Sequence, residues 1–217
     1  MTKLKVAVAI SGGGSNLQAI IDACSNPDYP VEITTVISNK ADAYGLERAR
    51  QANIATKVIS HKDYPDRESF DADLHQAILD SGAEFVILAG FMRILTDGFI
   101  NKWHDKMINI HPSMLPKFRG LDTHARAIEA GESHHGATVH YVRAELDTGP
   151  LILQCSEEIL ENDTASELAA RVLVKEHQIY PLALRWVAEG KVSIKDNDAY
   201  VNEFKGPILL DEAHKIS

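Results

Sequence analysis

Hydrophobic and polar positions change in regular blocks along the first hundred residues. Apolar runs bounded by turn residues predict buried strands at 5–10, 31–38, 56–59 and 85–89. Between them, apolar residues at helical spacing predict helices at 16–24, 43–52 and 66–81, the last with Asp66 as its N-cap. Strands that alternate with helices of this length are typical of βαβ units. The pattern therefore predicts an α/β fold with a mostly parallel, twisted sheet flanked by helices.

The pattern changes after about residue 100. Strands are predicted at 107–109, 136–142 and 151–156, separated by loops rather than helices, with antiparallel strands toward the C-terminal half. A long helix is predicted at 164–189, interrupted near Tyr180 and Pro181, because proline removes a backbone donor. The tail from 192 onward predicts a short strand pair and a mobile C-terminus. No repeat or linker divides the chain, so we expect one domain over residues 1–217.

Composition narrows the class of protein. A chain of 217 residues with 45% hydrophobic and 24% charged residues is typical of a soluble globular protein. The formal net charge of −9, without a Lys/Arg run, argues against general nucleic-acid binding. Two distant cysteines, Cys24 and Cys155, fit a reducing compartment better than a disulfide. We find no signal peptide and no run near the roughly 20 apolar residues that span a bilayer, so we expect a cytoplasmic protein without membrane contact.

The segment INIHPSMLP at 108–116 carries the clearest candidate chemistry. Asn109 and His111 are two residues apart, so they project from one face of an extended strand. A neutral donor beside an imidazole suits a reaction with a developing oxyanion and a mobile proton. Asp147, just before a Gly-Pro turn, could pair with His111 and favour its protonated form. The alternatives are a strand end with a satisfied histidine and an aspartate that only caps its turn.

A glycine-rich loop, SGGGSN at 11–16, joins the first predicted strand to the first helix. Such a loop can turn its N–H groups toward an anion at the helix N-terminus. Leu17 stands where a dinucleotide fingerprint needs glycine, and no lysine follows the glycines as a P-loop requires. A single phosphate monoester therefore suits this loop. The alternative is a tight turn in which Ser15 or Asn16 caps the helix.

Two further features have weaker signals. The loop GFMRIL at 90–95 follows a buried strand and could line a pocket for a flat heterocycle, or could simply pack in the core. Ten histidines invite a metal hypothesis, but no recognised metal-ligand spacing occurs. We therefore expect no metal, and we expect His124, His134 and His135 at the surface.

In combination, these motifs resemble those of the phosphoribosylglycinamide formyltransferases, folate-dependent enzymes of purine synthesis. The resemblance runs from SGGGSNL at Ser11 to EHQIYP at Glu176 and includes SNKADAYGLERA, LAGFMRIL, NIHPSMLPKFRG, HGATVHYV and ELDTGP. It implies a formyltransferase-type Rossmann-like fold. It also implies transfer of the formyl group of 10-formyltetrahydrofolate to the amine of 5-phosphoribosylglycinamide through a tetrahedral intermediate. The domain would comprise a phosphate-binding half (about 1–100), a catalytic and folate-binding half (about 85–190) and a C-terminal tail (about 191–217).

The same resemblance implies roles for individual residues. The catalytic residues would be Asn109, His111 and Asp147. The ribonucleotide substrate would contact Gly14, Ser15, Asn16 and Glu176. Folate would contact Arg67, Met92, Arg93, Ile94, Leu95, Asn109, Ala144, Glu145 and Leu146. The resemblance implies no metal and a monomer or homodimer as the assembly. Gly13, Thr148 and Leu173 depart from the family's pattern.

Related activities remain as alternatives. A formyltetrahydrofolate deformylase shares the NIHPS and LD-x-G signatures but normally carries an additional N-terminal regulatory domain. A methionyl-tRNA formyltransferase would need a C-terminal RNA-binding domain and a basic surface. The phosphate loop favours the ribonucleotide transferase over both. An alternative of another class is a binding module for nucleotides or folates that has no catalytic activity.

Overall fold

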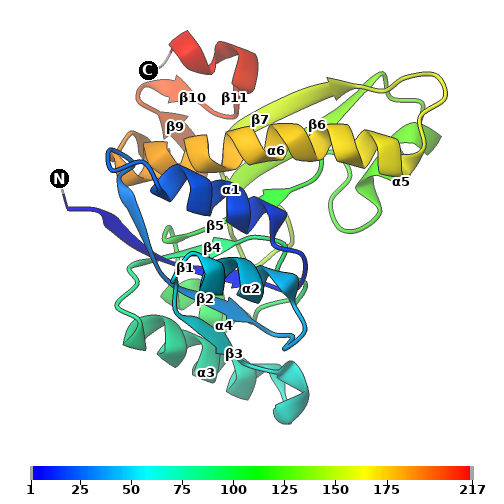
Figure 1. Ribbon diagram of the computed structural model, residues 1–217. Helices are drawn as coiled ribbons and strands as arrows, with labels where there is room; N and C mark the ends of the chain where they lie inside the picture. The colour runs from blue at the N-terminus through cyan, green and yellow to red at the C-terminus, as the bar shows by residue number, and fades with distance from the viewer. Residues whose placement is uncertain (1, 216–217) are drawn as a thin grey trace. The chain divides into compact units, whose positions relative to one another are not determined.

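The computed structural model describes residues 2–215 (Figure 1). The chain divides into two compact units, Met1–Asn109 and Ile110–Ser217. The boundary lies within one strand, β5 (Met107–His111). One domain over 1–217 stays a prediction.

The first unit is a doubly wound α/β structure. Its strands follow the order β5-β4-β1-β2-β3, and the described pairings among them are parallel. In chain order its elements are β1 (Leu4–Ile10), α1 (Ser15–Cys24), β2 (Val31–Ser38), α2 (Tyr44–Gln51), β3 (Thr56–Val58), the 3-10 helix η1 (His61–Asp63), α3 (Arg67–Asp80), β4 (Phe85–Leu88) and α4 (Asp97–Lys102), followed by β5.

The strand order reverses once in this unit. The chain runs outward through β1, β2 and β3, then returns to β4 on the other side of β1. Right-handed crossovers therefore place α1 and α2 on one face of the sheet and α3 and α4 on the other (Figure 1). The carboxyl ends of β1 and β4 form the switch point, where open α/β sheets bind their ligands.

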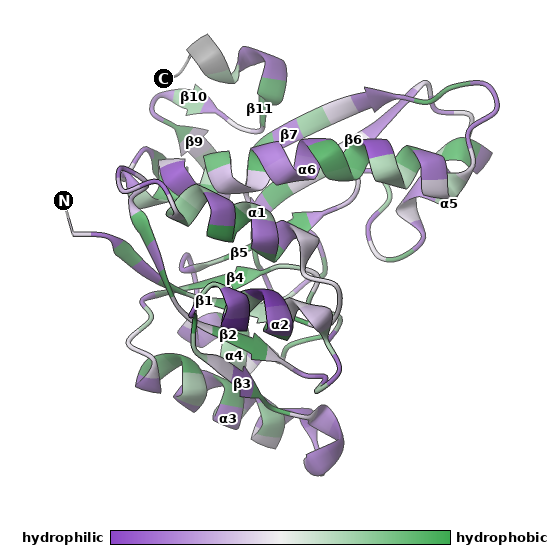
Figure 2. Cartoon of the chain, in the orientation of Figure 1, coloured by the Kyte–Doolittle hydropathy of each residue, from purple (hydrophilic) through white to green (hydrophobic). Residues whose placement is uncertain are grey.

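The second unit contains antiparallel strands and a long helix. Strand β6 pairs antiparallel with β7, β11 pairs parallel with β7, and β8, β9 and β10 form a separate antiparallel sheet. Helix α6 packs against β6 and β7, and Figure 2 shows hydrophilic and hydrophobic residues interspersed along it, as in an amphipathic helix. The elements are α5 (Thr123–Glu129), β6 (His134–Tyr141), β7 (Leu151–Glu158), α6 (Ala165–Ala188), β8 (Val192–Lys195), β9 (Asp198–Val201), β10 (Phe204–Lys205), β11 (Ile208–Leu209) and the 3-10 helix η2 (Leu210–Lys215).

The predicted fold class is confirmed, including the mostly parallel sheet and the antiparallel strands in the C-terminal half. Three local predictions are wrong. A helix, α5, precedes β6 where only loops were expected. Helix α6 continues through Pro181 because its buried stripe extends beyond the proline to Leu184 and Trp186, and this packing outweighs one lost backbone hydrogen bond. The tail has two more strands and a 3-10 helix beyond the predicted pair, while its last residues, 216–217, lie outside the described part.

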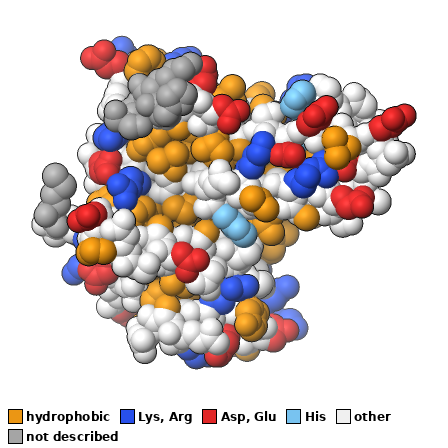
Figure 3. All heavy atoms as spheres, turned by 45° about the horizontal axis from the view of Figure 1, so that its top comes forward, with side chains coloured by type: hydrophobic (Ala, Val, Ile, Leu, Met, Phe, Trp, Pro, Cys, Tyr) orange, Lys and Arg blue, Asp and Glu red, His pale blue; other side chains and the backbone are white. Residues whose placement is uncertain are grey.

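The surface and the cysteines agree with the composition. Acidic and basic side chains are interspersed on the face in Figure 3. Cys24 and Cys155 are both free thiols. Within residues 2–215, no helix is both long and apolar enough to cross a membrane.

Candidate active site

The glycine-rich loop forms the N-terminus of α1. Gly14 is the N-cap, with a left-handed backbone (φ 68°), and no described side chain makes a capping hydrogen bond to this helix. The alternative in which Ser15 or Asn16 caps α1 is therefore wrong. Because the first amides of a helix lack intrahelical acceptors, this terminus has the geometry of an anion site.

Helix α2 holds this loop in place. A Cβ on Gly14 would lie 2.7 Å from the Cα of Gly45, so the two backbones meet directly. The Gly45 amide donates to the Gly12 carbonyl at 3.0 Å, and Arg48 Nε donates to the Gly13 carbonyl at 2.8 Å. Sequence reasoning did not select Gly45 or Arg48, although both lie in the SNKADAYGLERA motif.

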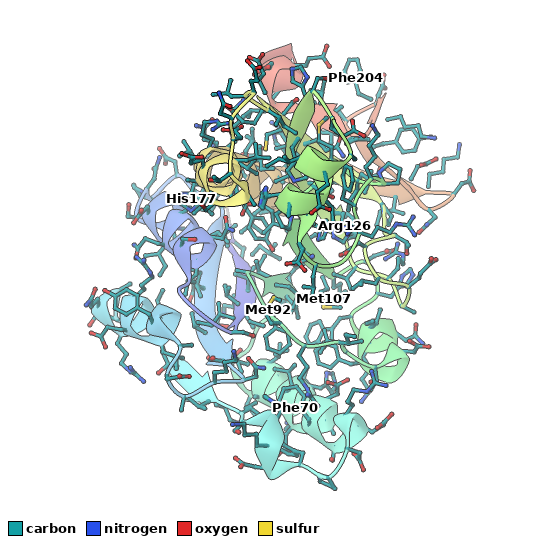
Figure 4. All side chains as sticks on the ribbon, turned by 90° about the vertical axis from the view of Figure 1, so that its right-hand side faces the viewer. Phe70, Met92, Met107, Arg126, His177 and Phe204 are labelled. Carbon is teal, nitrogen blue, oxygen red and sulfur yellow. The ribbon has the colours of Figure 1, made fainter. Side chains whose placement is uncertain are left out.

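The 90–95 loop has both exposed and buried apolar side chains. Met92 and Ile94 are 63% and 64% exposed, whereas Leu95 is buried in the core. The Arg93 guanidinium lies over the ring of Phe70 on α3, 4.6 Å from its centre; Figure 4 labels Met92 and Phe70. Two apolar side chains of the loop are thus available to a ligand. Arg67, the first residue of α3, is exposed.

His111 and Asp147 form a buried pair in the second unit. His111 Nδ1 lies 3.4 Å from Asp147 Oδ2, and His111 Nε2 lies 3.0 Å from the Phe118 carbonyl oxygen. A carbonyl oxygen only accepts hydrogen bonds, so Nε2 carries a proton and donates it to the Phe118 carbonyl. The Gly120 amide donates to Asp147 Oδ2 at 3.0 Å. These contacts hold the imidazole ring in one orientation.

A second histidine, His140, flanks the same carboxylate. Its Nε2 lies 3.8 Å from Asp147 Oδ1, and its Nδ1 faces the Tyr141 carbonyl at 2.8 Å. Burial lowers the pKa of His140 to about 4, so this ring is neutral near pH 7. Asp147 therefore lies between two buried histidines, His111 and His140. Sequence reasoning did not select His140 as a site residue.

Buried polar contacts fix the chain that follows His111. Thr138 Oγ1 on β6 donates to the Ser113 carbonyl at 2.7 Å and accepts from the Leu115 amide at 3.1 Å. Gln154 on β7 donates to the Leu115 carbonyl at 2.8 Å. Each of these groups is satisfied inside the protein, which holds the segment in one conformation.

One of the three histidines expected at the surface is buried. His135 is 1% exposed, and its Nε2 lies 2.9 Å from the Pro112 carbonyl oxygen. Burial and the nearby His124 lower the pKa of His135 to about 4. The error arose because adjacent residues of a strand face opposite sides, which leaves His134 exposed and turns His135 inward. His124 is half-buried, with its ring centre 4.8 Å from that of His135.

The loop before Asp147 is exposed to solvent, and a hydrogen bond within the loop stabilises its turn. Ala144, Glu145 and Leu146 are exposed, and Thr148 Oγ1 donates to the Glu145 carbonyl at 2.9 Å. Arg119 Nη1 lies 3.3 Å from Glu145 Oε1. Asp147 itself has a left-handed backbone (φ 54°). The loop thus turns sharply to direct the Asp147 carboxylate inward.

The two remaining candidates are Asn109 and Glu176. Asn109 is half-buried on β5, two residues before His111 and therefore on the same face of that strand. Glu176 is a buried carboxylate on α6. Burial raises the pKa of Cys155 to about 11, and the Glu176 charge contributes to this rise. Within residues 2–215, no group of three His, Cys, Asp or Glu side chains is placed to hold a metal ion.

Comparison with known proteins identifies the family of this chain. A family model described as formyl transferase matches residues 4–184. The phosphoribosylglycinamide formyltransferases of Haemophilus influenzae and Escherichia coli are 47% and 46% identical, over 91% and 92% of this chain and 93% and 94% of theirs. The structure of the Coxiella burnetii phosphoribosylglycinamide formyltransferase superposes with a TM-score of 0.90 at 46% identity, covering 94% of this chain and 96% of that one. The chain therefore belongs to the formyl transferase family, among the phosphoribosylglycinamide formyltransferases.

Proposed function

We propose that this enzyme transfers the formyl group of 10-formyltetrahydrofolate to the amine of phosphoribosylglycinamide. The products are formylglycinamide ribonucleotide and tetrahydrofolate, in purine biosynthesis. The observation that carries the proposal is the buried His111–Asp147 pair, in a chain 47% identical to a curated phosphoribosylglycinamide formyltransferase.

Asn109, His111 and Asp147 are the proposed catalytic residues. Attack by the amine on the formyl carbon places negative charge on the formyl oxygen. The Asn109 amide and the His111 imidazolium stabilise this oxyanion, and a donor of this kind contributes about 3–4 kcal/mol in comparable sites. Asp147 orients the imidazole, as its 3.4 Å distance to Nδ1 supports.

The bond changes balance without a covalent enzyme intermediate. The amine nitrogen forms a bond to the formyl carbon, and the bond from that carbon to folate N10 breaks. One proton leaves the amine and one proton reaches N10, by way of His111 or an ordered water. No nucleophilic side chain is needed for this direct transfer.

The ribonucleotide has two proposed contacts. Gly14, Ser15 and Asn16 hold its phosphate, which the anion-site geometry of the α1 N-terminus supports. Glu176 binds the glycinamide end, because a buried carboxylate suits an amine partner.

Folate has proposed contacts from several loops. The pterin ring packs on Met92 and Ile94, while buried Leu95 supports the loop from below. Arg67 offers a positive charge to the folate carboxylates. The full proposed set is Arg67, Met92, Arg93, Ile94, Leu95, Asn109, Ala144, Glu145 and Leu146.

Other properties follow as proposals. The enzyme acts in the cytoplasm, as a monomer or homodimer, without nucleic acid and without a metal. It works as one formyltransferase domain, which the family match across residues 4–184 supports.

The test is tetrahydrofolate release from 10-formyltetrahydrofolate, with and without phosphoribosylglycinamide. Release that requires the ribonucleotide, together with formylated product, supports the transferase. Release without the ribonucleotide means a deformylase instead. Binding of both ligands without release means a module that lacks catalysis.

A further inference from the structure

One buried hydroxyl joins two candidate binding loops of the first unit. Ser11, the residue after β1, is 4% exposed. Its Oγ donates to Asn39 Oδ1 at 2.6 Å and accepts from the Met92 amide at 2.8 Å. Its own amide donates to the Gly90 carbonyl at 3.1 Å. Ser11 thus makes three hydrogen bonds, and two of them reach the 90–95 loop.

Ser11 lies between the phosphate loop and the 90–95 loop. Ser11 directly precedes Gly12, the start of the phosphate loop, and Met92 follows β4, so both lie at the switch point of the sheet. Loop residues 91–95 have no regular secondary structure. Within residues 2–215, the bond from the Met92 amide to Ser11 is the only hydrogen bond of their backbone.

We propose that Ser11 is a positioning residue for folate, which sets the 90–95 loop from the phosphate-loop side. This inference rests on the proposed function, since it takes Met92 and Ile94 as the pterin contacts. Loss of the hydroxyl leaves the Met92 amide without its acceptor and frees the loop. The exposed Met92 and Ile94 side chains then have to be ordered by the ligand, and that ordering weakens binding.

The phosphate loop has anchors that do not involve the Ser11 hydroxyl. The Gly45 amide bonds the Gly12 carbonyl, and Arg48 bonds the Gly13 carbonyl. Removing the Ser11 hydroxyl should therefore affect folate far more than the ribonucleotide. A merely structural role would weaken both ligands together.

The neighbouring strand offers a matched control. Ser38 ends β2, pairs in register with Ile10 of β1 and is fully buried like Ser11. Among the residues that the structure describes, its hydroxyl bonds within its own turn alone, to the carbonyl and amide of Lys40. Ser38→Ala thus removes a buried serine hydroxyl at the carboxyl ends of the same strands. It removes no hydrogen bond to the 90–95 loop.

The experiment measures the Kd of tetrahydrofolate and of phosphoribosylglycinamide by calorimetry for wild type, Ser11→Ala and Ser38→Ala. We expect Ser11→Ala to raise the Kd of tetrahydrofolate about tenfold, the scale of one buried hydrogen bond, and that of the ribonucleotide by less than about twofold. Ser38→Ala should change neither. If Ser11→Ala does not fold, Asn39→Ala, which removes the acceptor that orients the Ser11 hydroxyl, should raise the Kd of tetrahydrofolate about threefold.

Two results would overturn the positioning role. One is an unchanged tetrahydrofolate Kd in Ser11→Ala, or in Asn39→Ala where that variant replaces it. The other is an equal rise in the Kd of both ligands, which means a merely structural role. Failure of the proposed function is a separate result, because wild type would then not bind tetrahydrofolate at all.

Discussion

At the scale of single residues, the buried His111 ring is contacted at both of its nitrogens. The ring is buried, its Nδ1 faces the Asp147 carboxylate, and its Nε2 faces the Phe118 carbonyl oxygen. The Gly120 amide donates to the same Asp147 oxygen that faces His111. This hydrogen bond holds the carboxylate in position. Contacts at both nitrogens therefore hold the ring in one orientation.

His111→Ala and Asp147→Asn should each lower kcat by at least about 100-fold while the protein stays folded. The reason is that one variant removes the proposed proton carrier and the other removes the carboxylate charge that faces and orients it. Steady-state kinetics with a melting curve for each variant is the measurement. The exposed pair His104–Asp105, 3.3 Å apart, supplies the control, since His104→Ala should retain full kcat. Near-normal turnover in a folded His111→Ala would remove His111 from the mechanism.

His135 predicts a pH dependence of stability. Burial lowers its pKa from the ordinary 6.5 to about 4, so the unfolded chain binds this proton first as pH falls. The stabilisation from neutral His135 is complete above pH 6.5 and is lost as pH falls toward 4. Near pH 5, His135→Gln should lower the number of protons taken up on unfolding by about one. Urea titrations between pH 7.5 and 4.5 measure this number.

The matched variant for that experiment is His134→Gln, at the exposed neighbouring position. Its unfolding free energy should follow the wild-type dependence on pH. If His135→Gln followed it too, another group would be responsible for the acid sensitivity.

The sequence could predict chemistry at single residues better than it could predict their partners. Residue types in INIHPS and ELDTGP identify an imidazole, an amide and a carboxylate. Nothing local specifies the Phe118 carbonyl against His111 Nε2, nor the serine hydroxyl between two loops, because both contacts join segments through the tertiary fold. The burial of His135 was hidden for a similar reason, since its face of the strand depends on register.

At the scale of elements, the phosphate loop depends on how closely two helix N-termini approach. Gly14 and Gly45 let α1 and α2 meet backbone to backbone, and a Cβ on Gly45 would lie 2.5 Å from Ile10 Cδ1. Two elements that are ordinary in sequence are thus brought together by a pair of residues without side chains. The motif SNKADAYGLERA indicated a helix. It did not indicate that the second residue of that helix, α2, contacts the glycine-rich phosphate loop.

Gly14→Ala should raise KM for phosphoribosylglycinamide about tenfold or more and leave KM for 10-formyltetrahydrofolate nearly unchanged, since the added methyl forces a shift in the packed loop. Gly82→Ala is the control. Gly82 has a similar φ of 74°, but no described atom lies within 4 Å of its Cβ position. Both variants incur about 1–2 kcal/mol of left-handed backbone strain, and only Gly14→Ala adds the clash. A tenfold change confined to folate would contradict the phosphate assignment.

Elements with strong periodicity were predictable, and those that depend on packing were not. Strand β2 was predicted to the residue, and α3 to one residue at each end. The short helices α4 and α5 have too few turns for a clear period, and their packing stabilises them instead. Pro181 led to a wrong prediction. The missing backbone donor of proline predicted a break in the helix, but the buried side of α6 continues beyond it.

At the scale of the whole molecule, net charge and ligand charge have the same sign. The formal charge is −9, while the proposed substrates carry a phosphate and carboxylates. Recognition then depends on short-range groups, such as the α1 N-terminus and single arginines, rather than on a long-range field. The interspersed charges on the face in Figure 3 agree with this reading.

The shared negative charge of protein and substrates predicts how the rate of the reaction responds to salt. At low ionic strength the protein repels both substrates, and added salt screens that repulsion beyond a Debye length of about 10 Å at 0.1 M. Raising potassium chloride from about 10 to about 100 mM should therefore raise kcat/KM by about two- to fivefold and leave kcat unchanged, because only the encounter of like charges is affected. Initial rates at several salt concentrations and constant pH measure this. A steep fall of kcat/KM over the same range would instead mean that positive charge around the bound anion attracts substrate over a distance, and Arg48, which already bonds the Gly13 carbonyl, would be the first residue to substitute.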